Sequence, residues 1–186
     1  GSVINNTSNT FSFGAGTINF TGSGKTIGGT NAIAITTGTF SGTYTNTGTL
    51  TVSSALSGSG TLTQGASSVL NIGGTFGGIT GLNASTNINT VNYTGASQAI
   101  KAVNYSSLTV NGSGTATIGG AVTVSGTMTV SSAATNNSTL TVTTALSGSN
   151  TLTQGASSVL NIGGTSGITG LDASTNANTV NYTGAA

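Results

Sequence analysis

The chain of 186 residues contains no proline, cysteine, tryptophan or histidine, and its only charged side chains are those of Lys25, Lys101 and Asp172. A single carboxylate cannot form a general acid–base pair. Without histidine or cysteine there is no Ser-His-Asp or Cys-His arrangement, and no imidazole or thiolate site for a metal. We therefore expect no enzymatic activity, no catalytic residues, no bound cofactor and no metal.

The scarcity of charge and of long apolar runs also limits the partners of this protein. Two lysines cannot form the basic surface that nucleic-acid binding requires, so we expect no nucleic-acid partner. No stretch approaches the roughly 18 apolar residues of a membrane-spanning helix, so we expect no transmembrane segment. Intrinsic disorder usually combines low hydrophobicity with high net charge, and the formal net charge here is only +1. The chain is instead rich in small residues, with 31 glycines and 39 threonines.

Long segments of the sequence recur at an offset of about 90 residues. Residues 61–75 (TLTQGASSVLNIGGT) are repeated without change at 151–165, and residues 78–96 are repeated at 167–185 with two substitutions. Self-similarity at a fixed period is typical of repeat architectures, in which each unit packs on its neighbour. We therefore predict two tandem units, residues 1–96 and 97–186, that form one continuous body without a linker.

A shorter period of twelve residues lies within these units. Thr-x-Thr pairs begin at positions 37, 49 and 61, and again at 115, 127, 139 and 151. Apolar residues and threonines alternate there, and an alternation of period two predicts β-strands. Clusters of serine, glycine and asparagine between these segments predict turns. Threonine, serine, glycine, valine and asparagine are weak helix formers, so we expect an all-β protein.

Among all-β architectures the sequence favours a β-solenoid over a propeller or an array of sandwiches. A spacing of about twelve residues suits either one short coil or one side of a larger coil, whereas blades and sandwiches need longer strands and more aromatic residues. The residues expected in the core are Leu50, Val52, Leu62, Leu70, Ile72, Leu140, Val142, Leu152, Leu160 and Ile162. The residues expected on an outward threonine face are Thr37, Thr39, Thr49, Thr51, Thr61, Thr63, Thr115, Thr117, Thr127, Thr129, Thr139, Thr141, Thr151 and Thr153.

Such a threonine face, and the few aromatic residues, each allow more than one interpretation. A flat array of hydroxyl and methyl groups is the surface with which ice-binding solenoids order water, whereas rows of threonine also stabilise neighbouring strands. Tyrosines in an exposed row would stack on sugars, whereas rings that alternate inward would fill the core. Asn71 and its repeat Asn161, and Asn92 and its repeat Asn181, are candidates for amide ladders between successive coils.

Two segments resemble the β-strand repeats of very large secreted bacterial surface proteins, which are grouped with the haemagglutinin-like adhesins. They are TVNYTGASQAIKAVNYSSLTVNGSGTATIGGAVTVSGTMTV (90–130) and SVLNIGGT…ASTNINTVNYTG (68–95), the second of which recurs in the other unit. The resemblance implies a secreted or cell-surface location and a structural role in a fibre or adhesin. It supplies no catalytic residues.

The ends of the predicted solenoid indicate how it would assemble. Soluble solenoids cover their terminal strands with polar or charged structure, because an open end exposes unpaired backbone groups. Neither end of this sequence has such a charged cap. We therefore expect the partners to be other copies of the chain, stacked head to tail, or adjoining repeats of the same polypeptide. The hypotheses at this point are a fibre or adhesin module, with an ice-binding solenoid and a carbohydrate-binding adhesin segment as alternatives.

Overall fold

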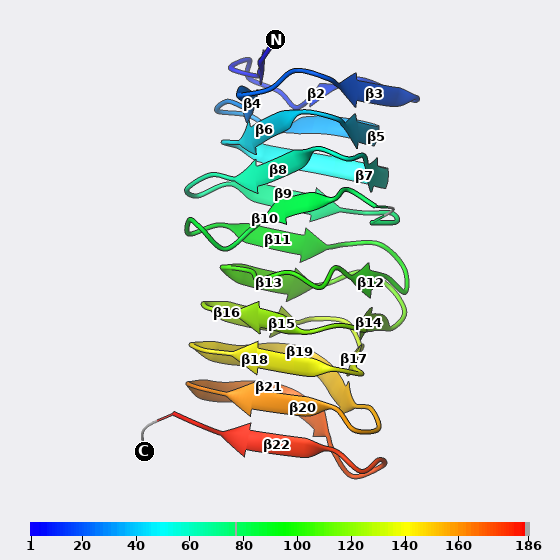
Figure 1. The fold of residues 1–186 in the computed structure, drawn as a ribbon, viewed down its shortest axis with the longest axis vertical. Helices are drawn as coiled ribbons and strands as arrows, with labels where there is room; N and C mark the ends of the chain where they lie inside the picture. Colours follow the sequence, from blue (N-terminus) through cyan, green and yellow to red (C-terminus); the bar gives the residue numbers. More distant parts are fainter. Residues whose placement is uncertain (77, 185–186) are drawn as a thin grey trace.

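The protein is a single column of stacked parallel strands (Figure 1). The computed structural model describes residues 1–76 and 78–184, and no helix occurs among them. Every strand pairs with its neighbours in parallel, as expected when a chain winds repeatedly in one direction around an axis. The prediction of an all-β solenoid is confirmed, and the solenoid has about nine turns.

The coils have three faces, which the chain visits in the order face 1, face 2, face 3, and most coils contribute a strand to each face. Face 1 comprises β2 (Phe11–Ser12), the first halves of β5 (Ile33–Phe40) and β7 (Thr49–Ser57), β9 (Val69–Ile72), β11 (Thr90–Tyr93), β13 (Ser107–Val110), β16 (Thr127–Val130), and the first halves of β19 (Ala145–Gln154) and β21 (Thr165–Asp172). Face 2 comprises β3 (Thr17–Phe20), the second halves of β5 and β7, β12 (Ala99–Ile100), β14 (Ala116–Ile118), β17 (Ala134–Asn136), and the second halves of β19 and β21.

Face 3 is made of separate short strands, with an isolated bridge in the middle. Tyr105 pairs with Ala84 on one side and with Val124 on the other, and so continues the column between β10 and β15. The strands of face 3 are β1 (Val3–Ile4), β4 (Lys25–Gly28), β6 (Thr43–Asn46), β8 (Thr61–Gln64), β10 (Gly81–Asn83), β15 (Val122–Val124), β18 (Thr139–Val142), β20 (Val159–Ile162) and β22 (Thr179–Tyr182).

The register between strands gives the length of a coil. Thr49 lies opposite Val69, and Val69 lies opposite Thr90, so a coil takes about 20 residues. The twelve-residue period of the sequence is therefore not a whole coil. It is the distance along the chain between two faces of one coil, because Thr49 is on face 1 and Thr61 is on face 3.

The interior is a continuous column of apolar side chains, most of them aliphatic. Leu50 packs in register with Leu70, and Val52 with Ile72, so the same kind of side chain repeats from coil to coil. All ten residues expected in the core have exposed fractions of 1% or less. Burying a leucine or valine side chain contributes about 1.5–3 kcal/mol. A narrow core can therefore stabilise a chain that has few large residues, provided that nearly all of them are inside.

Candidate functional surfaces

The predicted threonine face is divided among the three faces of the solenoid. The strands place Thr37, Thr39, Thr117, Thr151 and Thr153 on face 2, Thr49, Thr51, Thr127 and Thr129 on face 1, and Thr61, Thr63, Thr139 and Thr141 on face 3. Thr115 precedes β14 and lies outside a strand. These side chains alternate with buried residues and so point outward, but a twelve-residue step moves the chain to another face, so they do not form a single column.

No pair of the predicted series lies directly on another pair of that series among the described strands. Thr49 and Thr51 lie on Val69 and Asn71, and Thr127 and Thr129 lie on Ala145 and Ser147. The pair Thr43 and Thr45, outside the series, does stack on Thr61 and Thr63, and the next coil there brings Gly81 and Asn83. The expectation of one regular threonine array was therefore wrong, because the coil is longer than the period on which it rested.

Asparagine side chains form ladders on the outside of two faces. Asn92 donates its side-chain amide to Asn71 at 2.8 Å, and Asn71 donates in turn to the hydroxyl of Thr51 at 3.1 Å on face 1. The second unit repeats this arrangement on face 3, where Asn181 donates to Asn161 at 2.9 Å and Asn161 donates to Thr141 at 3.1 Å. The prediction that these asparagines form amide ladders is confirmed, and the structure shows which of them pair: Asn92 with Asn71, and Asn181 with Asn161. Each joins three successive coils by side-chain hydrogen bonds that add to the backbone ladder.

A second polar network, which the sequence analysis missed, is buried at a corner of the coil. Asn46 donates to Gln64 at 2.8 Å and to the carbonyl oxygen of Val69 at 3.0 Å, and the Ser68 hydroxyl donates to Gln64. The second unit has the same network, formed by Asn136, Gln154, Val159 and Ser158. The recurrence of these polar residues at the 90-residue offset was the signal that could have identified them. Most of their polar atoms bind one another and the backbone and so fix the corner, but the side-chain nitrogens of Gln64 and Gln154 are buried without a partner.

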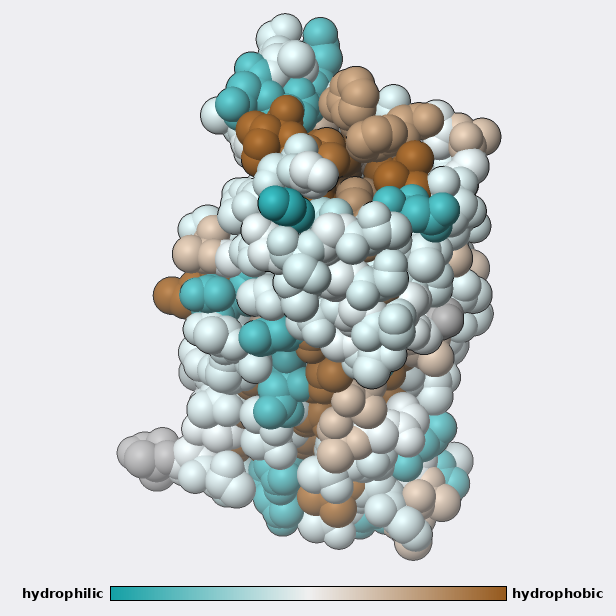
Figure 2. Space-filling model, turned by 45° about the horizontal axis from the view of Figure 1, so that its top comes forward, coloured by the Kyte–Doolittle hydropathy of each residue, from teal (hydrophilic) through white to brown (hydrophobic). Residues whose placement is uncertain are grey.

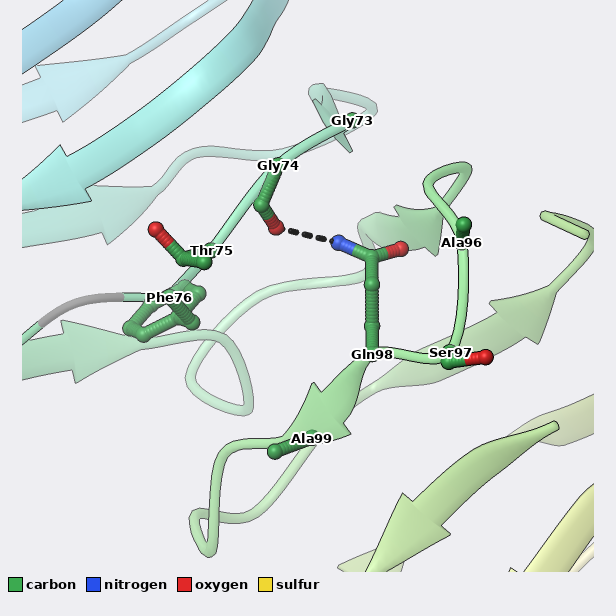
Figure 3. A pocket seen from close by; sticks show the side chains of 8 residues that line it. All are labelled: Gly73, Gly74, Thr75, Phe76, Ala96, Ser97, Gln98 and Ala99. Carbon is green, nitrogen blue, oxygen red and sulfur yellow. Dashed lines mark hydrogen bonds between the residues drawn. The ribbon is translucent and has the colours of Figure 1, made fainter. Parts of the chain in front are cut away.

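The stack on face 2 is interrupted between Thr75 and β12, where a hollow of about 510 Å³ opens (Figure 3). The residues lining it are Gly73–Phe76 and Ala96–Ala99. Gln98 spans the gap: its side-chain nitrogen donates to the carbonyl oxygens of Ile72 and Gly74, and its side-chain oxygen accepts from the backbone N–H of Gly95. The amide of Gln98 is therefore fully used in holding the two coils together.

Two buried tyrosines close the core next to this hollow. The hydroxyl groups of Tyr93 and Tyr105 are 2.9 Å apart; Tyr105 donates to the carbonyl oxygen of Lys101, and the backbone N–H of Lys101 donates to Tyr93. Burial raises the pKa of Tyr93 to about 12 and raises the pKa of Tyr105 well above its usual value. Both groups are thus neutral structural hydrogen-bonding groups at physiological pH.

The three charged residues lie far apart in the sequence, and two of them, Lys101 and Asp172, make local contacts. The ammonium group of Lys101 is 5.4 Å from the centre of the Phe76 ring, within the range of a cation–π contact. Asp172 accepts from the backbone N–H and hydroxyl of Ser174 and from the hydroxyl of Thr175, which holds its pKa below the usual value. Lys25 is exposed on β4.

The C-terminal end of the column leaves apolar side chains uncovered whose counterparts in the first unit are buried. Tyr182 is 67% exposed, whereas Tyr93, at the same place in the first TVNY segment, is 1% exposed. Val180 is only partly buried, whereas Val91 is fully buried. The exposure of these side chains differs because β13 lies beneath β11, whereas β22 pairs only with β20 above it. The last coil therefore offers both apolar surface and an unpaired strand edge.

The N-terminal end is also apolar. Hydrophobic side chains gather at this end of the molecule (Figure 2), where Ile4 is 50% and Phe11 is 46% exposed and Val3, Phe13 and Ile18 are partly buried. The terminal strand β3 pairs only with β5 below it. The two ends are thus the places where the described chain leaves both apolar groups and strand edges without partners, and we regard them as the candidate functional surfaces.

No family model, curated protein or solved structure matches this chain. The described part of the chain contains no helix that is long and apolar enough to cross a membrane. The functional interpretation therefore rests on the geometry of the ends and of the three faces.

Proposed function

We propose that this protein is a structural module of a secreted or cell-surface fibre or adhesin, in which β-solenoid ends stack on one another. The partner at each end is another copy of the chain or an adjoining repeat of the same polypeptide. The solenoid itself is the mechanical element: each coil is held to the next by a backbone ladder, a column of apolar side chains and amide ladders.

The observation that supports this proposal most directly is the contrast between the two TVNY strands. The same four residues are covered by the next coil in β11 and uncovered in β22. An open parallel strand edge with an apolar interior pairs readily with another edge of the same kind. A further coil of the same construction would bury Tyr182 and Val180 as β13 buries their counterparts.

The lateral faces give less support to the two alternatives. An ice-binding surface needs a regular plane of threonines over several coils, and these faces interrupt their threonines with asparagine, alanine, glycine and valine. A sugar-binding face needs an exposed row of aromatic rings, and here Phe20, Phe40 and Tyr44 are buried against one another. Phe11 and Tyr182, the strongly exposed rings, lie at opposite ends of the column.

Electron microscopy and sedimentation of the purified chain test this function. The wild-type protein should form filaments of the width of one solenoid. The double substitution Val180→Lys and Tyr182→Lys should abolish them, because two ammonium groups would have to be buried between coils.

A matched control places the same charges on a lateral face. The double substitution Thr127→Lys and Thr129→Lys lies on the outside of face 1, where both side chains reach solvent, and should leave filaments intact. A wild-type protein that sediments only as a monomer at about 100 µM would contradict the proposal. So would equal loss of filaments in the lateral variant.

A further inference from the structure

The two units have the same sequence segments but place them on different faces. TLTV is β18 on face 3 in the second unit and the start of β7 on face 1 in the first. TLTQ is β8 on face 3 in the first unit and the second half of β19 on face 2 in the second. Face 1 of the first unit thus corresponds to face 3 of the second, and face 3 corresponds to face 2.

The cause is a mismatch between the repeat length and the coil length. Starting from Thr49 on face 1, the column passes through Val69, Thr90, Ser107 and Thr127 and reaches Ala145 after five turns. The repeat of Thr49 is Thr139, which lies one strand before Ala145 along the chain and therefore on face 3. Each unit is one face short of five turns, so every following unit is rotated by one third of a turn.

This rotation determines which strands meet when a second copy stacks on the C-terminal end. Within the chain, the TVNY strand β11 is followed on the next coil by β13. The counterpart of β13 in the first unit is β3, since both directly precede a GSG turn, at 112–114 and at 22–24. By the same relation, β3 of a next copy would lie beneath the second TVNY strand, β22. Because β3 is on face 2 and β22 on face 3, the second copy would then be rotated by one face.

The residues of the two strands are complementary in this register. The pairing of β11 with β13 places Thr90 opposite Ser107 and Tyr93 opposite Val110. The same pairing of TVNY in β22 with TINF in β3 places Thr179 on Thr17, Val180 on Ile18, Asn181 on Asn19 and Tyr182 on Phe20.

Two structural series within the molecule would continue across this junction. Asn19 would occupy the next position in the amide ladder of Asn161 and Asn181. Tyr182 would lie on Phe20, which already stacks on Phe40 with ring centres 4.4 Å apart and planes inclined by 13°. Without rotation, β22 would instead meet β1, which offers only two residues, Val3 and Ile4.

We infer that the partner of the C-terminal end is a second copy of this chain, rotated by one third of a turn about the solenoid axis, with β3 paired in register beneath β22. This inference rests on the proposed end-to-end stacking and specifies its geometry. Two units advance the chain by nine and one-third turns. At about 4.8 Å per coil, each molecule then extends the filament by about 45 Å.

Engineered cysteines test the junction directly, because the chain has no cysteine of its own. The double variant Asn19→Cys with Asn181→Cys should form disulfide-linked oligomers under mild oxidation, visible as a ladder on a non-reducing gel. Two matched variants test the other rotations: Ile4→Cys with Asn181→Cys for no rotation, and Ser12→Cys with Asn181→Cys for the opposite rotation. Both should remain largely unlinked, since the paired cysteines would lie on different faces.

The outcomes separate this inference from the proposed function. Filaments in which the Ile4 or Ser12 variant cross-links as well as or better than the Asn19 variant would overturn the rotation and leave end-to-end stacking in place. Filaments with no ladder in any variant would also overturn it. Absence of both filaments and ladders would overturn the proposed function itself. Helical reconstruction of wild-type filaments gives a second measurement, with an expected rotation near 120° per molecule in addition to the twist of the column.

Discussion

At the scale of single residues, amide and hydroxyl groups provide the specific polar contacts of this protein, since it has almost no charge. Gln98 is the clearest example, because one side chain bonds two carbonyl groups of the neighbouring coil and one N–H of its own coil where the face-2 ladder is interrupted. An unsatisfied buried polar group costs more than a hydrogen bond normally contributes. Such residues are therefore expected to be much more sensitive to substitution than their number of contacts suggests.

Substitution of Gln98 by leucine should lower the free energy of unfolding by about 2 kcal/mol or more, since the N–H of Gly95 and the carbonyl oxygen of Gly74 lose their partner. Urea unfolding followed by circular dichroism measures this. Asn104→Leu, on the exposed loop before Tyr105, is the control and should change stability by less than about 0.5 kcal/mol. Equal effects of the two substitutions would show that the hydrogen bonds of the Gln98 side chain do not contribute to stability.

The tyrosine pair predicts a loss of stability at alkaline pH. The raised pKa of Tyr93, about 12, means that the folded state keeps a proton that the unfolded state loses near pH 10. The stabilisation is therefore complete below pH 10 and is lost as the pH rises from 10 towards 12. Thermal unfolding between pH 9 and 12 should show a steep decline in the wild type and a shallower one in Tyr93→Phe with Tyr105→Phe. Identical pH profiles would contradict this account.

At the scale of elements, the close approach of successive coils restricts which residue can occupy a corner. Gly58 and Gly148 have φ angles of +114° and +131°, and a Cβ atom there would lie 2.0 and 2.1 Å from the carbonyl oxygens of Phe40 and Val130. Glycine is therefore required at these corners by both backbone conformation and space. The two positions are equivalent in the two units, so the same corner is built twice.

Replacing Gly148 with alanine should cost about 3 kcal/mol or more, because the methyl group forces neighbouring coils apart. Gly16→Ala is the matched control: its φ is +124°, close to that of Gly148, but a Cβ atom there meets nothing within 4 Å, so only backbone strain of about 1–3 kcal/mol is expected. The difference between the two variants in urea unfolding measures the contribution of coil-to-coil packing. A Gly148→Ala variant no less stable than Gly16→Ala would refute it.

At the scale of the whole molecule, the near absence of charge determines how stability and assembly respond to salt. Three isolated charged residues give little electrostatic energy to screen. Urea unfolding midpoints and filament mass should therefore be nearly the same at about 0.02 and 0.15 M NaCl. Filaments that dissolve as salt is raised would show that charge contributes to the junction, and the apolar ends proposed here would not be sufficient.

The sequence by itself determined the class of fold and the core, and it indicated that asparagines form ladders without showing which of them pair. Alternation of apolar and small polar residues fixes which side chains point inward wherever a strand forms, so Leu50, Val52 and their counterparts could be identified without coordinates. The identical neighbours of Asn71 and Asn161 likewise indicated that these amides would lie on similar strands.

Only the tertiary structure decided how long a coil is, and with it which residues share a face. The local pattern shows that residues alternate but not where the chain completes a turn, since corners of different length give the same alternation. Thr49 and Thr61 were for this reason assigned to one column, although one lies on face 1 and the other on face 3. The rotation between the two units also follows from the coil length. The repeat of about 90 residues is not a whole number of coils, and the part of a turn that is missing is the rotation.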